Sequence, residues 1–160
     1  MGKKLGVLIT TIAVAALVVG VTIPAAAGSS GQAGNDRTFR VTATVTEVSQ
    51  IDLGAPGPSL GDEIVFSGQL LQGGQQIGHQ GAVCTTVSLK LKEDQCNATY
   101  SFGGGQITAQ AVFILGSAAP YDVAITGGTG KYEGAKGEIQ VIPATPPANP
   151  NGILTFHLQD

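Results

Sequence analysis

A single carboxylate stands out as a side chain that could do chemistry. Over residues 39–48 apolar and polar residues alternate, so one face of an extended strand carries Phe39, Val41, Ala43 and Val45. Glu47 is the next residue on that apolar face. A carboxylate facing a core or cavity loses hydration unless it is paired, and there Glu47 could stabilise a developing positive charge or move a proton. Periodicity equally allows Glu47 to lie just past the core edge, in solvent.

A glycine-rich stretch, residues 124–137, is the second candidate for chemistry; its turn-forming glycines are Gly127, Gly128, Gly130, Gly134 and Gly137. A P-loop needs Ser or Thr after Gly-Lys, but here Tyr132 follows Lys131. A dinucleotide fingerprint needs a helix after its glycines, and each glycine inside a helix costs about 1 kcal/mol. The stretch therefore predicts a tight connection between strands instead of a phosphate site.

The remaining catalytic templates are not met. His79 and His157 have no neighbouring ligands at metal spacing, and no Gly-x-Ser-x-Gly elbow occurs. We therefore expect no metal site and no cofactor.

Cys84 and Cys96 are the only cysteines. In an exported domain, two cysteines that flank a hairpin favour a disulfide. Directly opposed cysteines require a hairpin centred on Lys90, whereas the polar residues 92–95 suggest a turn centred near Glu93. Two buried thiols are the alternative.

The first 27 residues have the organisation of a signal peptide. Lys3 and Lys4 precede an apolar run that reaches Ile23, and Pro24 and three alanines follow before Gly28. We expect cleavage after residue 27, a flexible leader over residues 28–37, and a secreted protein, whether extracellular, cell-surface or periplasmic. The alternative is an uncleaved anchor, since about 20 apolar residues span a bilayer; only then would the protein contact a membrane.

The chain after the signal is acidic and suits one all-β domain. Without Lys3 and Lys4, six basic residues stand against eleven acidic ones, a net charge of −5. Such a surface has no basic stripe to neutralise phosphates, so nucleic acid is not an expected partner. Few charges, many glycines and no long helical period indicate a single all-β domain over residues 38–160.

Seven or eight short strands separated by turns are predicted, which suits a closed barrel or a sandwich. The predicted strands span residues 39–48, 63–71, 80–91, 96–102, 107–115, 121–126, 138–142 and 153–159. Residues 52–59, with Pro56, form a loop at the rim, because prolines cannot donate to a ladder. Small interior residues could leave room for a cavity: Ala43, Gly68, Ala109 and Ala111.

Four segments resemble allene oxide cyclase: residues 61–66, 81–84, 98–102 and 124–135. The glycine-rich piece, with Gly137 after it, also resembles plant dirigent proteins. The resemblance covers roughly residues 39–160. It implies an eight-stranded antiparallel barrel that binds an apolar, reactive small molecule in its lumen and steers ring closure or coupling, and that assembles as a trimer in many members.

The resemblance also implies site residues. Glu47 falls where the cyclases carry a lumen glutamate, and Phe66, Cys84 and Phe113 match a lumen aromatic, cysteine and tyrosine; Ser49 and Pro56 are the other implied ligand-binding residues. Four positions depart from the family pattern: Ser49 and Gly68 replace asparagines, Cys96 replaces a second lumen phenylalanine, and Phe113 stands where the cyclases have the tyrosine. The loss of two amides and a phenol hydroxyl argues against allene oxide itself as the substrate. A disulfide would also remove Cys84 as a free thiol.

The resulting hypothesis is an exported barrel that binds an apolar small molecule and steers its cyclisation, isomerisation or coupling without a cofactor. The resemblance implies that it assembles as a homotrimer. A non-catalytic carrier of hydrophobic ligands is one alternative. A structural surface protein with a filled barrel is the other.

Overall fold

The computed structural model describes residues 36–114, 117–144 and 151–159. The predicted signal peptide and the leader up to residue 35 lie outside the described residues, and Arg37 already belongs to the first strand. The elements are β1 (Arg37–Ile51), β2 (Glu63–Gln72), β3 (Gln75–Ser88), β4 (Glu93–Phe102), β5 (Gly105–Phe113), β6 (Tyr121–Gly128), the 3-10 helix η1 (Gly130–Tyr132), β7 (Lys136–Pro143) and β8 (Asn151–Gln159). No helix in this part of the chain is long and apolar enough to cross a membrane.

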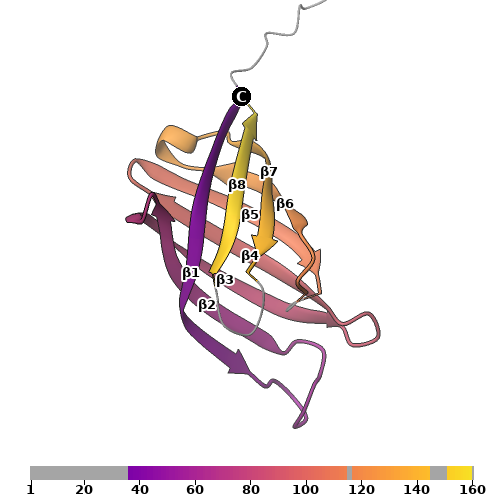
Figure 1. The fold of residues 1–160 in the computed structure, drawn as a ribbon. Helices are drawn as coiled ribbons and strands as arrows, with labels where there is room; N and C mark the ends of the chain where they lie inside the picture. The colour runs from indigo at the N-terminus through magenta and orange to yellow at the C-terminus, as the bar shows by residue number, and fades with distance from the viewer. Residues whose placement is uncertain (1–35, 115–116, 145–150, 160) are drawn as a thin grey trace, which may run out of the picture. The chain divides into compact units, whose positions relative to one another are not determined.

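The eight strands form one closed antiparallel barrel (Figure 1). Each strand pairs with the next in sequence, and β8 pairs with β1 to complete the ring. Closure pairs the strand edges that an open sheet would expose, and alternate residues of each strand point into the lumen. The predicted all-β, eight-stranded barrel is confirmed.

One half of the lumen is filled with aromatic rings, and we call it the closed half. Phe156 is fully buried and stacks on Phe39, with 4.7 Å between ring centroids. Tyr100 and Phe102 approach the Phe156 ring edge-on at 5.1 and 5.6 Å. Edge-to-face pairs at these distances add to the free energy gained from burial. This half is a conventional packed core.

The glycine-rich segment connects β6 to β7 beside the closed half. Gly130 begins η1 with φ at 60°, and a Cβ there would collide with the carbonyl oxygen of Gly104. Gly134 has φ at 75°, a conformation that side chains other than glycine rarely adopt. The turn places Tyr132 in the core, where its ring lies 5.7 Å from that of Phe102. The predicted strand connection is confirmed.

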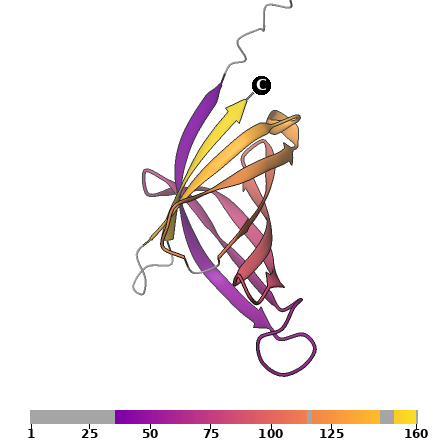
Figure 2. The same ribbon diagram turned by 90° about the vertical axis from the view of Figure 1, so that its right-hand side faces the viewer.

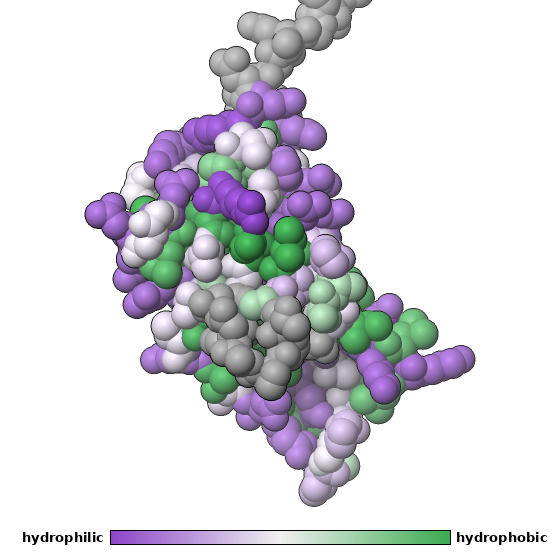
Figure 3. All heavy atoms as spheres, viewed as in Figure 1, coloured by the Kyte–Doolittle hydropathy of each residue, from purple (hydrophilic) through white to green (hydrophobic). Residues whose placement is uncertain are grey.

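The opposite half is flared, and we call it the open half. The β1–β8 ladder ends at Thr44, whereas β1 continues to Ile51 with β2 as its remaining partner. The β1–β2 hairpin therefore projects beyond the other strands (Figure 2). Apolar side chains are exposed around this end; Figure 3 shows them at the tip of the β3–β4 hairpin, where Leu89 and Leu91 are 48% and 56% exposed.

Candidate functional site

The open half contains a cavity of about 170 Å³ inside the barrel. All eight strands contribute to its walls. Four of the lining residues are alanines at lumen positions of β1, β3, β4 and β5: Ala43, Ala82, Ala98 and Ala109. Side chains of this size cannot meet across an eight-stranded barrel, whereas the phenylalanines of the closed half do. The sequence prediction that small interior residues leave a cavity agrees with this space.

Two buried polar side chains form the floor of the cavity. Gln80 of β3 and Tyr100 of β4 are direct cross-strand partners, and both line the space. They are 8% and 5% exposed, and neither side chain has a hydrogen-bond partner among the residues that the structure describes. Buried polar groups in proteins are nearly always paired, so these two have hydrogen-bonding capacity to spare.

A third polar group, the hydroxyl of Tyr121 on β6, lines the same cavity. Burial raises the pKa of Tyr100 far above its usual range, and the nearby Tyr121 raises it further. Burial also raises the pKa of Tyr121. Both phenols are therefore neutral near pH 7, and each offers an O–H donor to the cavity.

Phe66 and Phe113 both line the cavity, on the face where the sequence placed them. Phe113 stacks against Tyr121, with 4.3 Å between ring centroids and 20° between ring planes. Both phenylalanines are only partly buried. They are placed to contact a bound molecule near the mouth, although ligand binding by either stays a prediction.

Glu47 lies outside the barrel, because β1 contains a bulge. Val45 is opposite Gly68 of β2, yet Glu47 is opposite Ser67, so Thr46 is an extra residue. An extra residue reverses the inward and outward alternation that follows it. The prediction that Glu47 continues the lumen face is therefore wrong.

The hydrogen bonding of Glu47 supports the outward placement. Ser67 alternates with the cavity-lining Phe66 and so faces outward, and its hydroxyl donates to Glu47 Oε2 at 3.0 Å. The Glu47 side chain is exposed. The alternative prediction, that Glu47 lies in solvent beyond the edge of the core, describes its position better. A role for Glu47 in chemistry stays a prediction, and it would concern the outer surface.

Ser49 lies on the same outer face as Glu47. A shallow concavity of about 540 Å³ crosses this face over β1 to β4, lined by outward side chains such as Ser49, Val65 and Val83. Pro56 is exposed in the β1–β2 loop and lines none of the barrel cavity. Ser49 therefore faces the outer surface because of the same bulge, and Pro56 lies in the rim loop that the sequence predicts; ligand binding by either residue stays a prediction.

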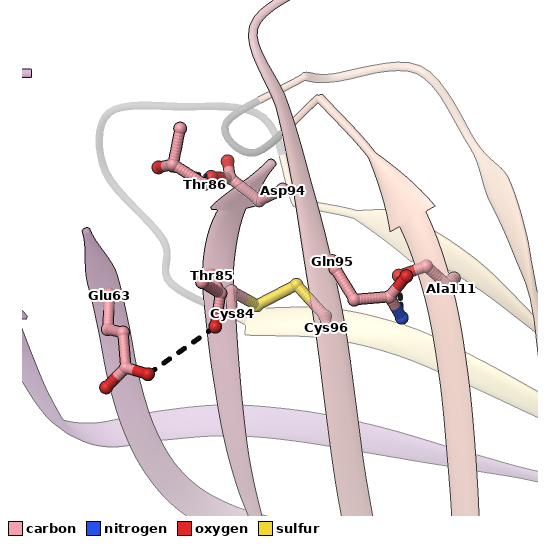
Figure 4. Close-up of a disulfide and its surroundings, with 8 residues drawn as sticks. All are labelled: Glu63, Cys84, Thr85, Thr86, Asp94, Gln95, Cys96 and Ala111. Atoms are coloured by element: carbon pink, nitrogen blue, oxygen red, sulfur yellow. Dashed lines mark hydrogen bonds between the residues drawn. A yellow bond between two sulfur atoms is a disulfide. The ribbon is translucent and has the colours of Figure 1, made fainter. Parts of the chain in front are cut away.

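Cys84 and Cys96 form a disulfide that joins β3 to β4 (Figure 4). The two residues are directly opposed in the ladder, so the predicted disulfide is confirmed and the alternative of two thiols is wrong. The hairpin centre predicted near Glu93 is also wrong, because β3 ends at Ser88 and β4 begins at Glu93. Cys96 lines the cavity as half of the bridge, which leaves Cys84 no free thiol.

The β1–β2 loop is held by a carboxylate. Asp62 accepts hydrogen bonds from the backbone N–H of Ser59 at 2.7 Å and of Leu53 at 3.0 Å, and from the Ser59 hydroxyl at 2.8 Å. These bonds, the Ser59 backbone bond first, lower the pKa of Asp62. Within the described ranges, no group of three or more His, Cys, Asp or Glu side chains gathers where a metal ion could bind.

Sequence reasoning missed the polar floor. Gln80 shares its strand face with Ala82 and Cys84, and Tyr100 shares its face with Ala98 and Cys96. The sequence therefore did contain a signal for the polar floor: on each strand, one polar residue alternates with small residues that face the lumen. Tyr121 could not be assigned in this way, since only the register of β6 places it beside the cavity.

Comparisons with known proteins agree with the fold. Residues 42–153 match the allene oxide cyclase barrel like domain. Among solved structures, pyocyanin demethylase is 31% identical with a TM-score of 0.66, over 77% of this chain and 100% of that chain. A comparison with curated protein sequences finds no match.

More distant structures share the barrel alone. The pterocarpan synthase dirigent protein GePTS1 is 15% identical with a TM-score of 0.61, over 77% of this chain and 82% of that chain. A nonspecific heme-binding cyclase that catalyses a cycloaddition during neoabyssomicin biosynthesis is 15% identical with a TM-score of 0.62, over 78% of this chain and 65% of that chain. Because the domain match spans most of the barrel and the strand order agrees, this chain belongs to the allene oxide cyclase barrel like family.

Proposed function

We propose that this protein binds an apolar small molecule in the open half of its barrel and steers the cyclisation, isomerisation or coupling of that molecule. The observation that carries the proposal is the cavity of about 170 Å³ with alanine walls and unpaired polar groups. An empty cavity of this size destabilises a protein by on the order of 4 kcal/mol. A barrel that served only as a scaffold would gain stability from larger side chains, so the filled structural barrel is the weaker alternative.

The cavity favours control by shape over acid–base catalysis. The residues of the described chain that line the cavity include no acidic residue, no basic residue and no histidine. A rigid cavity can still hold a flexible molecule near the conformer that reacts, which lowers the entropic part of the barrier. Phenol and amide donors can in addition stabilise charge that develops on an oxygen atom. This chemistry requires no cofactor.

The size of the cavity limits the ligand. An apolar cavity of about 150 Å³ accepts benzene, whereas pockets for drug-sized molecules have about 300–1,000 Å³. A ligand of one or two rings fits within the lumen. A longer ligand would extend past Phe66 and Phe113 at the mouth.

The relation to pyocyanin demethylase favours a second candidate function, demethylation of a small aromatic compound, in which the methyl carbon would leave as formaldehyde with oxygen from water while the aromatic ring takes up the two electrons. This similarity has twice the sequence identity of the dirigent and cyclase structures and spans the whole of that chain. Pyocyanin is therefore the first compound to test. Loss of pyocyanin in the presence of the purified protein, followed by absorbance, would favour demethylation, whereas binding without turnover would favour a carrier.

Blocking the cavity tests the proposal directly. Ala109 is 2% exposed and lines the cavity, so Ala109→Leu should fill much of the space and weaken binding of pyocyanin or a small bicyclic ligand by roughly ten-fold or more. Isothermal titration calorimetry measures the loss. Tyr132→Phe in the closed half is the matched control and should bind like the wild type. Equal affinity of wild type and Ala109→Leu would place the ligand elsewhere and contradict the proposal.

Export and assembly are part of the same proposal. A disulfide between neighbouring strands suits an oxidising compartment, which supports secretion. Fractionation of the native host, with N-terminal sequencing of the product, would test both export and cleavage after residue 27. The homotrimer implied by the family resemblance stays a prediction, and sedimentation equilibrium would measure it.

A further inference from the structure

The polar floor of the cavity carries information about the ligand. Gln80 and Tyr100 are more than nine-tenths buried, line the cavity and have no side-chain hydrogen bond to any residue described. A buried polar group without a partner destabilises the folded state, so such groups are rare in native proteins. Two of them side by side on one cavity floor indicate that the missing partner is supplied from outside the chain.

The chemistry of the floor suits a ligand that accepts hydrogen bonds. The Gln80 amide offers two N–H donors beside its carbonyl oxygen, and the neutral Tyr100 hydroxyl offers one O–H donor beside its lone pairs. Direct pairing of these residues across β3 and β4 brings both donors to one level of the barrel. The hydroxyl of Tyr121 on β6 adds a donor from another side of the cavity. One ligand oxygen with two lone pairs can accept from two of these groups at once.

The walls of the cavity exclude a charged ligand. No side chain with a full charge lines the described cavity, and its walls are alanines, valines, a leucine and aromatic rings. An ion moved into such surroundings loses its hydration without gaining a counter-charge. A hydrocarbon without polar atoms would enter, but it would leave the Gln80 and Tyr100 donors unpaired.

We propose that the ligand of the lumen is a neutral, mainly apolar molecule with a carbonyl oxygen at one end, and that this oxygen enters first to accept hydrogen bonds from Gln80 and Tyr100. The inference rests on the proposed function and names its ligand class. The apolar body then lies among Ala82, Ala98 and Ala109, and its far end reaches the mouth.

Three probes of one size separate this inference from lumen binding in general: indane, 1-indanone and indane-1-carboxylate. The wild type should bind 1-indanone roughly ten-fold more tightly than indane, the effect of a hydrogen bond made by donors that are already desolvated. The carboxylate should bind more weakly than either. Titration calorimetry measures the affinities, and the side-chain amide resonances of Gln80 should shift with 1-indanone and stay near their free positions with indane.

Two variants remove the donors one at a time. Tyr100→Phe and Gln80→Leu should each reduce the preference for 1-indanone over indane to about two- or three-fold while indane binding is kept. Tyr132→Phe removes the hydroxyl of a buried tyrosine that does not line the cavity, so it should keep the full preference. Thermal unfolding confirms that each variant is folded, and the use of both variants covers the failure of one to fold.

The outcomes are distinct. Equal binding of indane and 1-indanone by the wild type, or an unchanged preference in both folded variants, overturns the carbonyl inference and leaves the proposed lumen site intact. Tighter binding of the carboxylate also overturns it. Binding of none of the three probes contradicts the proposed function itself.

Discussion

The closed and open halves of the barrel are built from the same eight strands, yet their interiors differ. Phe39, Phe102 and Phe156 meet across the closed half, with ring centroids 4.7 to 5.6 Å apart. In the open half the same three strands present smaller residues around an unfilled space, such as Ala43 of β1, Ala98 of β4 and Gly152 of β8. The difference shows that strand order and the alternation of residues determine the barrel, whereas the size of the side chains at lumen positions determines where a cavity remains.

The halves also differ in how their ends are held together. A glycine-rich turn with a buried tyrosine lies at the closed half, so apolar packing holds that end. A disulfide and the hydrogen bonds of Asp62 hold the open end. Covalent and polar links of this kind hold strands apart at a fixed distance without filling the space between them.

The largest effect on stability is expected when the central aromatic ring of the closed half, that of Phe156, is truncated. Phe156→Ala should lower the free energy of unfolding by about 3–5 kcal/mol, because Phe156 is 0% exposed and contacts three other rings. The matched variant Phe113→Ala in the open half should lower it by only about 1–2 kcal/mol, since Phe113 is partly exposed. Urea denaturation measures both. Equal losses would show that the two halves are packed alike.

Removal of the disulfide should have the next largest effect. Cys84→Ala with Cys96→Ala opens a loop with a sequence separation of 12 residues, and should lower the free energy of unfolding by about 3 kcal/mol. Unfolding in urea with and without a reductant gives the same comparison on the wild type. The double variant is the control, because a reductant should leave its unfolding midpoint unchanged. No change in the wild type on reduction would mean that the open half does not depend on the bridge.

Filling the cavity should change stability far less. Ala109→Leu adds a side chain where free volume exists, so the free energy of unfolding should stay within about 1 kcal/mol of the wild type, although ligand binding is lost. In the closed half, Val41→Phe should destabilise by about 1–3 kcal/mol, because Val41 is 2% exposed and does not line the cavity. Thermal unfolding ranks the two. The opposite ranking would mean that the open half has no usable space.

A local effect of acid is expected at the β1–β2 loop. The pKa of Asp62 is lowered from 3.8 by its hydrogen bonds, first to the Ser59 backbone, so their stabilisation is present above the unfolded pKa and is lost as the pH falls through the lowered folded value. Amide chemical shifts of Leu53 and Ser59, followed by NMR below pH 4, should report this change. Asp62→Asn should abolish the titration, whereas Asp122→Asn on β6 should leave it in place. The aliphatic resonances of the closed half should not move with it.

The smallest effect on ligand binding is expected at Glu47, the residue that sequence periodicity favours most as a catalytic group. Glu47→Gln should leave the affinity for 1-indanone or pyocyanin unchanged within about two-fold, because the carboxylate faces away from the lumen. Glu138→Gln, at an exposed site on β7, is the control. A ten-fold change for Glu47→Gln alone would show that this side chain reaches the ligand and that the bulge does not hold in solution.

Most of the fold could be predicted from the sequence, because alternating residues and turn glycines are local signals. The largest boundary error lies at the start of β3, predicted at Gln80 and observed at Gln75. A second error lies at the β3–β4 hairpin, where Leu89 and Leu91 alternate with lysines like strand residues but occupy the exposed tip. Exposed leucines cannot be told from buried ones by periodicity alone. The polar residues 92–95, which follow these leucines, were therefore predicted to form the turn.

The site was predicted less well than the fold. Phe66 precedes the register shift of β2 at Leu70, and the shift on the β5–β6 ladder has its extra residue on β6, so the alternation of β5 continues to Phe113. Both phenylalanines were placed correctly in the lumen. Glu47 and Ser49 follow the bulge at Thr46, and a bulge depends on how β1 registers with β2, which no local pattern encodes. The family resemblance did not correct the error, since it transfers residue positions and not side-chain direction.

The aromatic side chains of the closed half close one end of the lumen. A molecule that enters past Phe66 and Phe113 meets Phe156 and its neighbours at the far end, so entry and exit share one opening. A bound molecule would therefore leave by the path along which it entered, with the end that entered last going first.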